Sequence, residues 1–111
     1  MLIDTGPLVA YLNRHDVHHE WAKAQFRRLR GPLLTCEAVV NEAVFLIEDD
    51  VGDGTPVLEL LVHGILDIEF VLRKEAGAVV ALMKRYRNVP MSLADACLVR
   101  MSEIHEQSML L

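Results

Sequence analysis

Apolar residues along the chain follow two different spacings. Short continuous runs are typical of buried strands, and longer stretches with apolar residues every three or four positions are typical of helices. Ser, Thr and Pro mark the expected helix starts, and Gly marks several ends. The pattern predicts strands at 1–4, 33–35, 65–71 and 108–111. It predicts helices at 5–13, 17–30, 55–63, 74–87 and 93–105. A further helix is predicted to begin after the cap Thr35 and to end in the acidic segment 48–54.

This alternation of strands and helices determines the expected fold class. Strands separated by helices predict a mostly parallel sheet covered by helices on both faces. The sequence has no repeat or linker, so we expect residues 1–111 to form a single domain. In such folds, functional groups gather at the carboxyl ends of the strands.

Three acids interrupt apolar segments: Asp4, Glu42 and Asp95. Asp4 ends the first predicted strand, and the other two lie early in predicted helices. None of the helical neighbours three or four positions from Glu42 or Asp95 is basic. A carboxylate in apolar surroundings is unfavourable unless it is paired, hydrogen-bonded or bound to a cation. The three acids therefore suggest one shared cation.

Each acid also has a structural explanation that stays open at this point. Asp95 follows Ser92 by three residues, which is the spacing of a capping box. Asp4 can cap the helix that follows it. Glu42 has the weakest structural explanation, because it lies within its helix without a partner.

Three segments of the sequence resemble the PIN-domain family, specifically the VapC-type toxins of toxin–antitoxin pairs. They are residues 2–13 with Asp16 and His18 shortly after, residues 34–36 with 40–43, and residues 90–96. The resemblance covers essentially the whole chain and implies a three-layer α/β/α sandwich with a mostly parallel central sheet.

The resemblance also implies a function. It implies a Mg²⁺- or Mn²⁺-dependent ribonuclease that hydrolyses RNA phosphodiester bonds and is inhibited by a small antitoxin protein. Asp4, Glu42 and Asp95 are the implied catalytic and metal-binding residues, and Thr5 is the implied ancillary polar group.

One feature departs from the family pattern. Family members usually carry a further acid in a Thr-x-Asp-x-Asp-Phe segment after a strand like Met109–Leu111, and this sequence ends at Leu111. We therefore expect a C-terminally truncated domain that lacks the fourth acid and the closing strand. The alternative function is a catalytically weak or inactive PIN-fold binding module. A receiver-like phosphate-transfer domain centred on Asp4 is disfavoured, because no second acid stands beside it.

Charge and composition add expectations about partners. The net charge is −5, and residues 31–69 contain nine acids and no Lys or Arg. This division fits an acidic cleft with basic flanks that hold an RNA backbone, although solvated helix faces give the same pattern. Hydrophobic residues make up 52% of the chain. We therefore expect a homodimer or higher assembly, with contacts from 21–29 and 58–62.

The sequence also predicts a location. No apolar run reaches the ~18 residues of a membrane span, and the start has no basic region of a signal peptide. Cys36 and Cys97 are far apart in the sequence and form no Cys-x-x-Cys pair. Free thiols in a reducing, cytoplasmic setting are the expectation.

Overall fold

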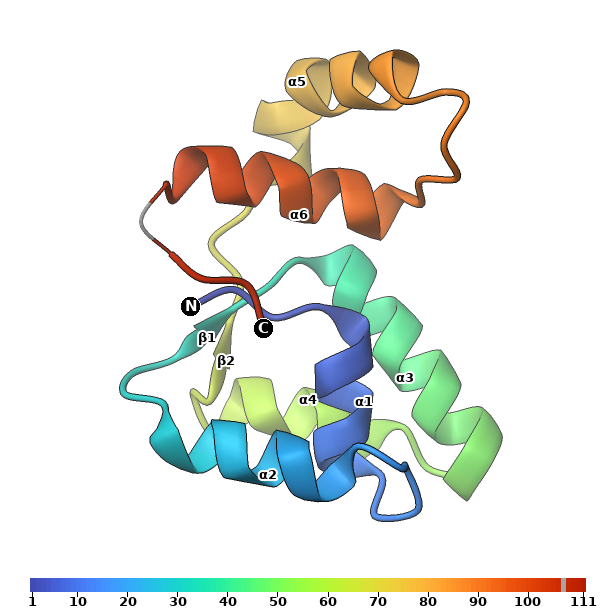
Figure 1. Ribbon diagram of the computed structural model, residues 1–111, viewed down its shortest axis with the longest axis vertical. Helices are drawn as coiled ribbons and strands as arrows, with labels where there is room; N and C mark the ends of the chain where they lie inside the picture. Colours follow the sequence, from blue (N-terminus) through green and yellow to red (C-terminus); the bar gives the residue numbers. More distant parts are fainter. Residues whose placement is uncertain (107) are drawn as a thin grey trace.

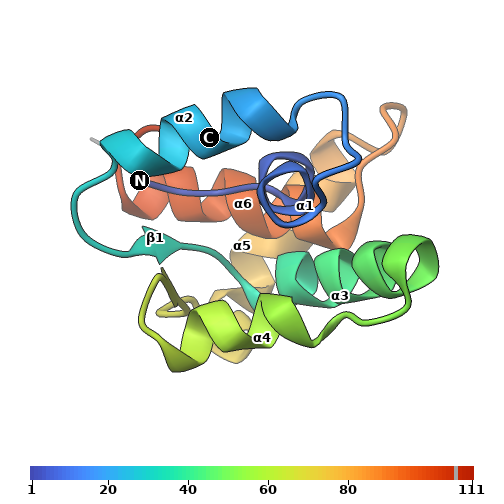
Figure 2. The ribbon, with the colours of Figure 1, turned by 90° about the horizontal axis from the view of Figure 1, so that it is seen from below.

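The computed structural model describes residues 1–106 and 108–111 and shows short strands between two groups of helices (Figure 1). Helices α5 and α6 lie on one side of the strands, and α1, α2 and α4 lie on the other. Helix α3 runs along the side and contacts α1, α4 and α6. In Figure 2, which views the molecule from below, α1 and α2 lie in front of α6, and α4 lies in front of α5. The helices are α1 (Thr5–Leu12), α2 (His19–Arg28), α3 (Glu37–Val51), α4 (Thr55–Val62), α5 (Leu72–Arg85) and α6 (Leu93–Ile104).

Every strand pairing in the described residues is parallel, as the alternation of strands and helices predicts. Strand β1 (Leu33–Leu34) pairs with β2 (Leu66–Asp67), with Leu33 opposite Leu66. Leu2 lies between Leu34 and Leu110 and forms a parallel bridge to each. The spatial order is therefore the C-terminal segment, the N-terminal segment, β1 and β2.

The prediction of a strand over 65–71 is wrong for its second half. The ladder between β1 and β2 ends where the Thr35 N–H donates to the Asp67 carbonyl at 3.1 Å. Beyond this point the β1 chain turns into α3, so residues 68–71 have no neighbouring strand to pair with.

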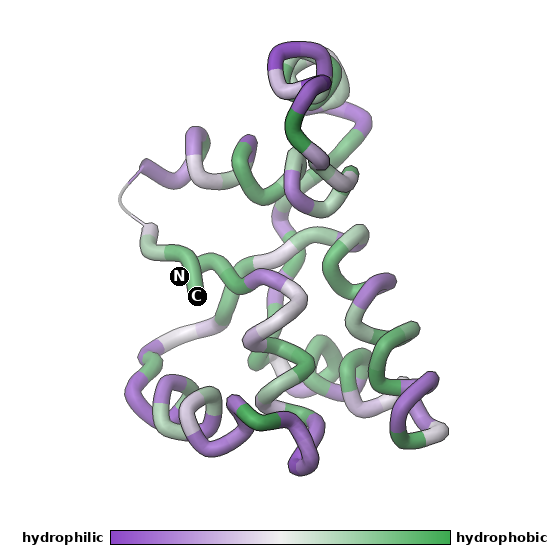
Figure 3. Tube along the Cα trace, turned by 45° about the vertical axis from the view of Figure 1, so that its right-hand side comes forward, coloured by the Kyte–Doolittle hydropathy of each residue, from purple (hydrophilic) through white to green (hydrophobic). Residues whose placement is uncertain are grey.

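The core forms around the central strand segments. Leu2 and Ile3 are fully buried, and Leu33 and Leu66 are 1% exposed. These side chains pack with the buried faces of α3 and α6 in one apolar cluster. Figure 3 shows the hydrophobic character of the chain near both termini, in the middle of the molecule. Burial of this aliphatic cluster is the main favourable term in folding.

Two glycines shape the acidic connection between α3 and α4. Gly52 ends α3 with a φ of 87°, in the left-handed region that favours glycine. Gly54 lies so close to α3 that an added Cβ would sit 2.6 Å from the carbonyl oxygen of Val44. The acidic segment is therefore a tight turn between two packed helices.

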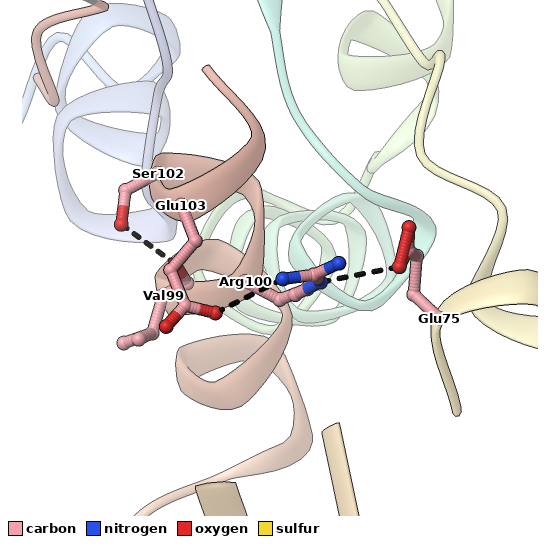
Figure 4. Close-up of polar contacts among 5 residues, drawn as sticks. All are labelled: Glu75, Val99, Arg100, Ser102 and Glu103. Atoms are coloured by element: carbon pink, nitrogen blue, oxygen red, sulfur yellow. Dashed lines mark hydrogen bonds and ion pairs between the residues drawn. The ribbon is translucent and has the colours of Figure 1, made fainter. Parts of the chain in front are cut away.

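Arg100 links the two helices of the outer layer. Its Nε lies 3.1 Å from the Glu75 carboxylate on α5, and its Nη1 lies 3.4 Å from Glu103 on its own helix (Figure 4). In the same view, the Ser102 hydroxyl donates to the carbonyl of Val99 within α6. Half-exposed ion pairs contribute little stability. The Arg100–Glu75 pair joins α5 to α6, and the Arg100–Glu103 pair lies within α6.

Apolar side chains remain exposed in both segments expected to form assembly contacts. Trp21 is 49% exposed, Leu58 is 45% exposed and Val62 is 80% exposed. Assembly through these residues stays a prediction. In the part of the chain that the structure describes, no helix is long and apolar enough to cross a membrane.

Candidate active site

Asp4 lies at the carboxyl end of the first strand segment and begins α1. Its backbone N–H donates to the carbonyl of Leu111 at 3.1 Å, and its Oδ1 accepts the N–H of Thr5 at 2.6 Å. Asp4 is therefore the N-cap of α1, which confirms the capping role that its sequence position allows. Thr5 already lies within the helix, which leaves its hydroxyl available for another contact.

The Thr5 hydroxyl connects α1 to α3. It donates to Oε2 of Glu42 at 2.8 Å, and Thr5 itself is only 7% exposed. Thr5 thus contacts both acids, Asp4 through its backbone and Glu42 through its side chain. Glu42, like Asp4, is half-buried. The fold brings together two of the three predicted acids, which are far apart in the sequence.

A second hydrogen bond also joins the α1 segment to α3. Asn13, at the end of α1, donates from its side-chain amide to the Asp50 carboxylate near the end of α3. Thr5 and Glu42 are 37 residues apart, and so are Asn13 and Asp50. Helices α1 and α3 therefore run parallel, joined at two points about two turns apart. The sequence analysis did not identify Asn13. The signal for it was its distance of 37 residues from Asp50, which equals the distance from Thr5 to Glu42.

The beginning of α3 differs from its predicted cap. Cys36 is the N-cap, and Thr35 is the residue before it. Thr35 is fully buried, and its hydroxyl donates to the carbonyl of Ile3 at 3.1 Å. This bond gives the carbonyl of Ile3, next to Asp4, a hydrogen-bond donor. The Thr35 hydroxyl therefore lies in the core and does not cap α3.

Asp95 occupies a different environment from the one expected. Its Oδ2 accepts the N–H of Ser92, and its own N–H donates to the Ser92 hydroxyl, both at 3.0 Å. This reciprocal pair is the predicted capping box. The expectation that Asp95 lies in apolar surroundings is wrong, because its side chain is exposed on α6. Among the described residues, no three His, Cys, Asp or Glu side chains are grouped as a metal site.

The capping box gives a stability prediction. Ser92→Ala should lower the free energy of unfolding by about 1 kcal/mol, because the amide of Asp95 loses its acceptor at the start of α6. Thermal or urea unfolding measures the change. Ser102→Ala is the matched control, since it removes an exposed hydroxyl bonded within the same helix and should be nearly neutral. Equal losses in the two variants would show that the box does not stabilise α6.

The Asp4–Glu42 pair fits a hard divalent cation. Oδ1 of Asp4 and Oε2 of Glu42 accept hydrogen bonds from Thr5, while the second oxygen of each has no protein partner among the described residues. No described Lys or Arg forms an ion pair with either acid. Mg²⁺ is commonly held by one or two carboxylates and keeps several waters. Two carboxylates at a strand end meet that requirement without forming a closed cage.

Both the sequence and the fold of this chain match known proteins. A sequence model of the PIN domain family matches residues 1–110. The fold is similar to the crystal structure of Mycobacterium tuberculosis VapC20, described as a sarcin-ricin loop cleaving toxin, with a TM-score of 0.85 and 17% sequence identity. The match covers 95% of this chain and 82% of that one. No curated protein matches the sequence.

Proposed function

Since this chain belongs to the PIN domain family, we propose that it is a metal-dependent ribonuclease toxin of the VapC type. Its proposed substrate is RNA, since a structural neighbour is described as a sarcin-ricin loop cleaving toxin. The observation that carries the proposal is the pair of half-buried carboxylates, Asp4 and Glu42, joined through Thr5 at a strand end. Two linked acids without a described cationic partner form an anionic centre suited to Mg²⁺ or Mn²⁺.

The residues of this centre have separate tasks in phosphodiester hydrolysis. Asp4 and Glu42 are the carboxylates that hold the cation, and Thr5 fixes the direction of both. A bound divalent cation supplies positive charge for the phosphate oxygens and increases the acidity of a water molecule. Asp95 caps α6 through Oδ2 and is exposed, and we propose that its other oxygen contributes to the site through water.

The RNA backbone needs positive charge outside the acidic centre. Arg73 and Lys74 at the start of α5 are exposed, as are Arg27 and Arg28 at the end of α2. We assign phosphate contacts to these side chains, since Lys and Arg provide the salt-dependent part of nucleic-acid affinity. A small antitoxin protein and a second copy of the chain are the proposed protein partners, and the exposed apolar residues of α2 and α4 are available to them.

A PIN-fold binding module without useful catalysis is the second candidate. It is favoured by Asp95, because this acid caps its own helix and the described residues contain no group of three metal-binding side chains. In that case the chain binds RNA or a protein partner through the same fold and does not cleave. Cleavage assays with added Mg²⁺ or Mn²⁺ distinguish the two candidates.

Thr5 provides the test of the proposed site. Thr5→Val keeps the side-chain shape but removes the hydroxyl that holds Glu42, so Mg²⁺-dependent cleavage of single-stranded RNA should fall about 10- to 100-fold. Thr5→Ser retains the hydroxyl and should stay within about threefold of the natural chain. Fluorescent RNA substrates and gel analysis measure both rates.

Two outcomes would reject the proposal of a metal-dependent ribonuclease, and a third would reject the role of the Thr5 hydroxyl. Cleavage that persists after chelation of divalent cations would exclude the proposed metal dependence. Binding of RNA without cleavage in Mg²⁺ or Mn²⁺ would favour the binding module. Equal rates for Thr5→Val and Thr5→Ser would remove the positioning role of the hydroxyl.

A further inference from the structure

The only two cysteines of the chain meet in the folded protein, although 60 residues separate them in the sequence. Cys36 is the N-cap of α3 and is 2% exposed, and Cys97 lies on α6 and is 1% exposed. Helices α3 and α6 pack against each other, and the two thiols are close enough for each to affect the pKa of the other. Both are free thiols, and both line one pocket of about 560 Å³.

This pocket connects the thiols to the surface. Its walls include Phe70 and Leu93, and its rim includes the exposed residues Glu37, Leu72 and Arg73. A small oxidant such as hydrogen peroxide fits easily in this volume. The two core cysteines therefore line a pocket that also has exposed residues on its walls.

We propose that Cys36 and Cys97 form a redox-active dithiol that hydrogen peroxide converts to an intrachain disulfide. In the first step the thiolate of one cysteine attacks a peroxide oxygen, the O–O bond breaks, and the departing hydroxide takes up a proton to give water. The cysteine becomes a sulfenic acid. In the second step the other thiolate attacks the sulfenic sulfur, the S–O bond breaks, hydroxide leaves as water, and the S–S bond forms. Two thiols and one peroxide thus give one disulfide and two waters.

The disulfide would join the two helices that carry predicted acids. Cys36 precedes Glu42 on α3, and Cys97 follows Asp95 on α6. A bridge that closes a loop of this length restricts the unfolded chain strongly. The oxidised protein should therefore melt at least about 5 °C higher than the reduced protein. This result does not depend on the proposed ribonuclease activity.

Peroxide treatment of the reduced 111-residue chain tests the proposal by intact mass and thermal unfolding. We expect a loss of 2 Da, a peptide that links Cys36 to Cys97, no free thiol, and a higher melting temperature that a phosphine reductant reverses. Cys36→Ser and Cys97→Ser should each lack the 2 Da loss and accumulate a dimedone-reactive sulfenic acid on the remaining cysteine.

The natural chain alone can overturn the inference. A gain of 16 or 32 Da without the 2 Da loss would show that the sulfurs do not reach bonding distance. A disulfide between two chains, or an oxidised form that melts at a lower temperature, would contradict an unstrained bridge within one chain.

Discussion

Replacing Asp4 with Asn, or Glu42 with Gln, should lower metal-dependent RNA cleavage on the order of 1,000-fold. Each change removes a negative charge from the pair that holds the cation, and electrostatic groups of this kind supply large parts of a catalytic rate. The fold should survive, because Asn also caps helices well and the carbonyl oxygen of Gln can accept the Thr5 hydroxyl. Initial cleavage rates at saturating Mg²⁺ measure the loss.

Glu48→Gln is the matched control for this prediction. Glu48 lies on α3 with Glu42 but is exposed, and we assign it no part in the site. The control removes the same charge from the same helix and should retain nearly full activity. If Glu48→Gln and Glu42→Gln lose activity equally, the effect comes from net charge and not from the Asp4–Glu42 centre. If either Asp4→Asn or Glu42→Gln matches the natural rate, that acid is not a catalytic ligand.

Leu2→Ala should destabilise the fold by about 3 kcal/mol and lower the melting temperature by roughly 10 °C or more. Leu2 is fully buried, and its backbone lies between the segments of Leu34 and Leu110. Truncating it removes apolar contacts in the middle of the sheet and leaves a cavity that strand backbones cannot easily close. Urea unfolding with a two-state fit measures the change in the free energy of unfolding.

Leu110→Ala makes the same chemical change on a neighbouring segment of the same sheet. Leu110 is 57% exposed, so its truncation should lower the free energy of unfolding by less than about 1 kcal/mol. A loss at Leu110 as large as that at Leu2 would mean that the outer segment is covered in solution. A loss below 1 kcal/mol at Leu2 would contradict its place at the centre of the core.

Local signals in the sequence predicted the features that depend on neighbouring residues. The start of α1 after Asp4 and the capping box of Ser92 and Asp95 follow from short-range hydrogen bonds that particular residue types make. The parallel sheet follows from the alternation of element types. The end of α3 follows from Gly52, whose left-handed backbone few other residues adopt readily.

Features that depend on tertiary contacts were not predictable in the same way. Thr35 has the right residue type for a cap, but its hydroxyl satisfies the carbonyl of Ile3 in the core, so Cys36 takes the cap position. Residues 68–71 have strand-like composition but lack a neighbouring strand. In both cases the hydrogen-bond partner is set by a segment that is distant in the sequence.

In the candidate site, too, some features followed from the local sequence and others depend on tertiary contacts. The apolar sequence around Asp4 and Glu42 marked both acids, and the fold joins them through Thr5. The same reasoning placed Asp95 in apolar surroundings, although it lies on the solvent side of α6. Helical neighbours three and four positions away do not determine which face of a short helix is covered. The contact between Cys36 and Cys97 likewise arises only from the packing of α3 against α6.

The central claim is that Asp4 and Glu42 hold one divalent cation between them. A titration with Mn²⁺, followed by the electron paramagnetic resonance signal of the free ion, tests this claim most directly. We predict one Mn²⁺ per chain for the natural protein and for Glu48→Gln, and at least about tenfold weaker binding for Glu42→Gln and Asp4→Asn. Equal Mn²⁺ affinity in the natural chain and in Glu42→Gln would contradict a shared metal centre.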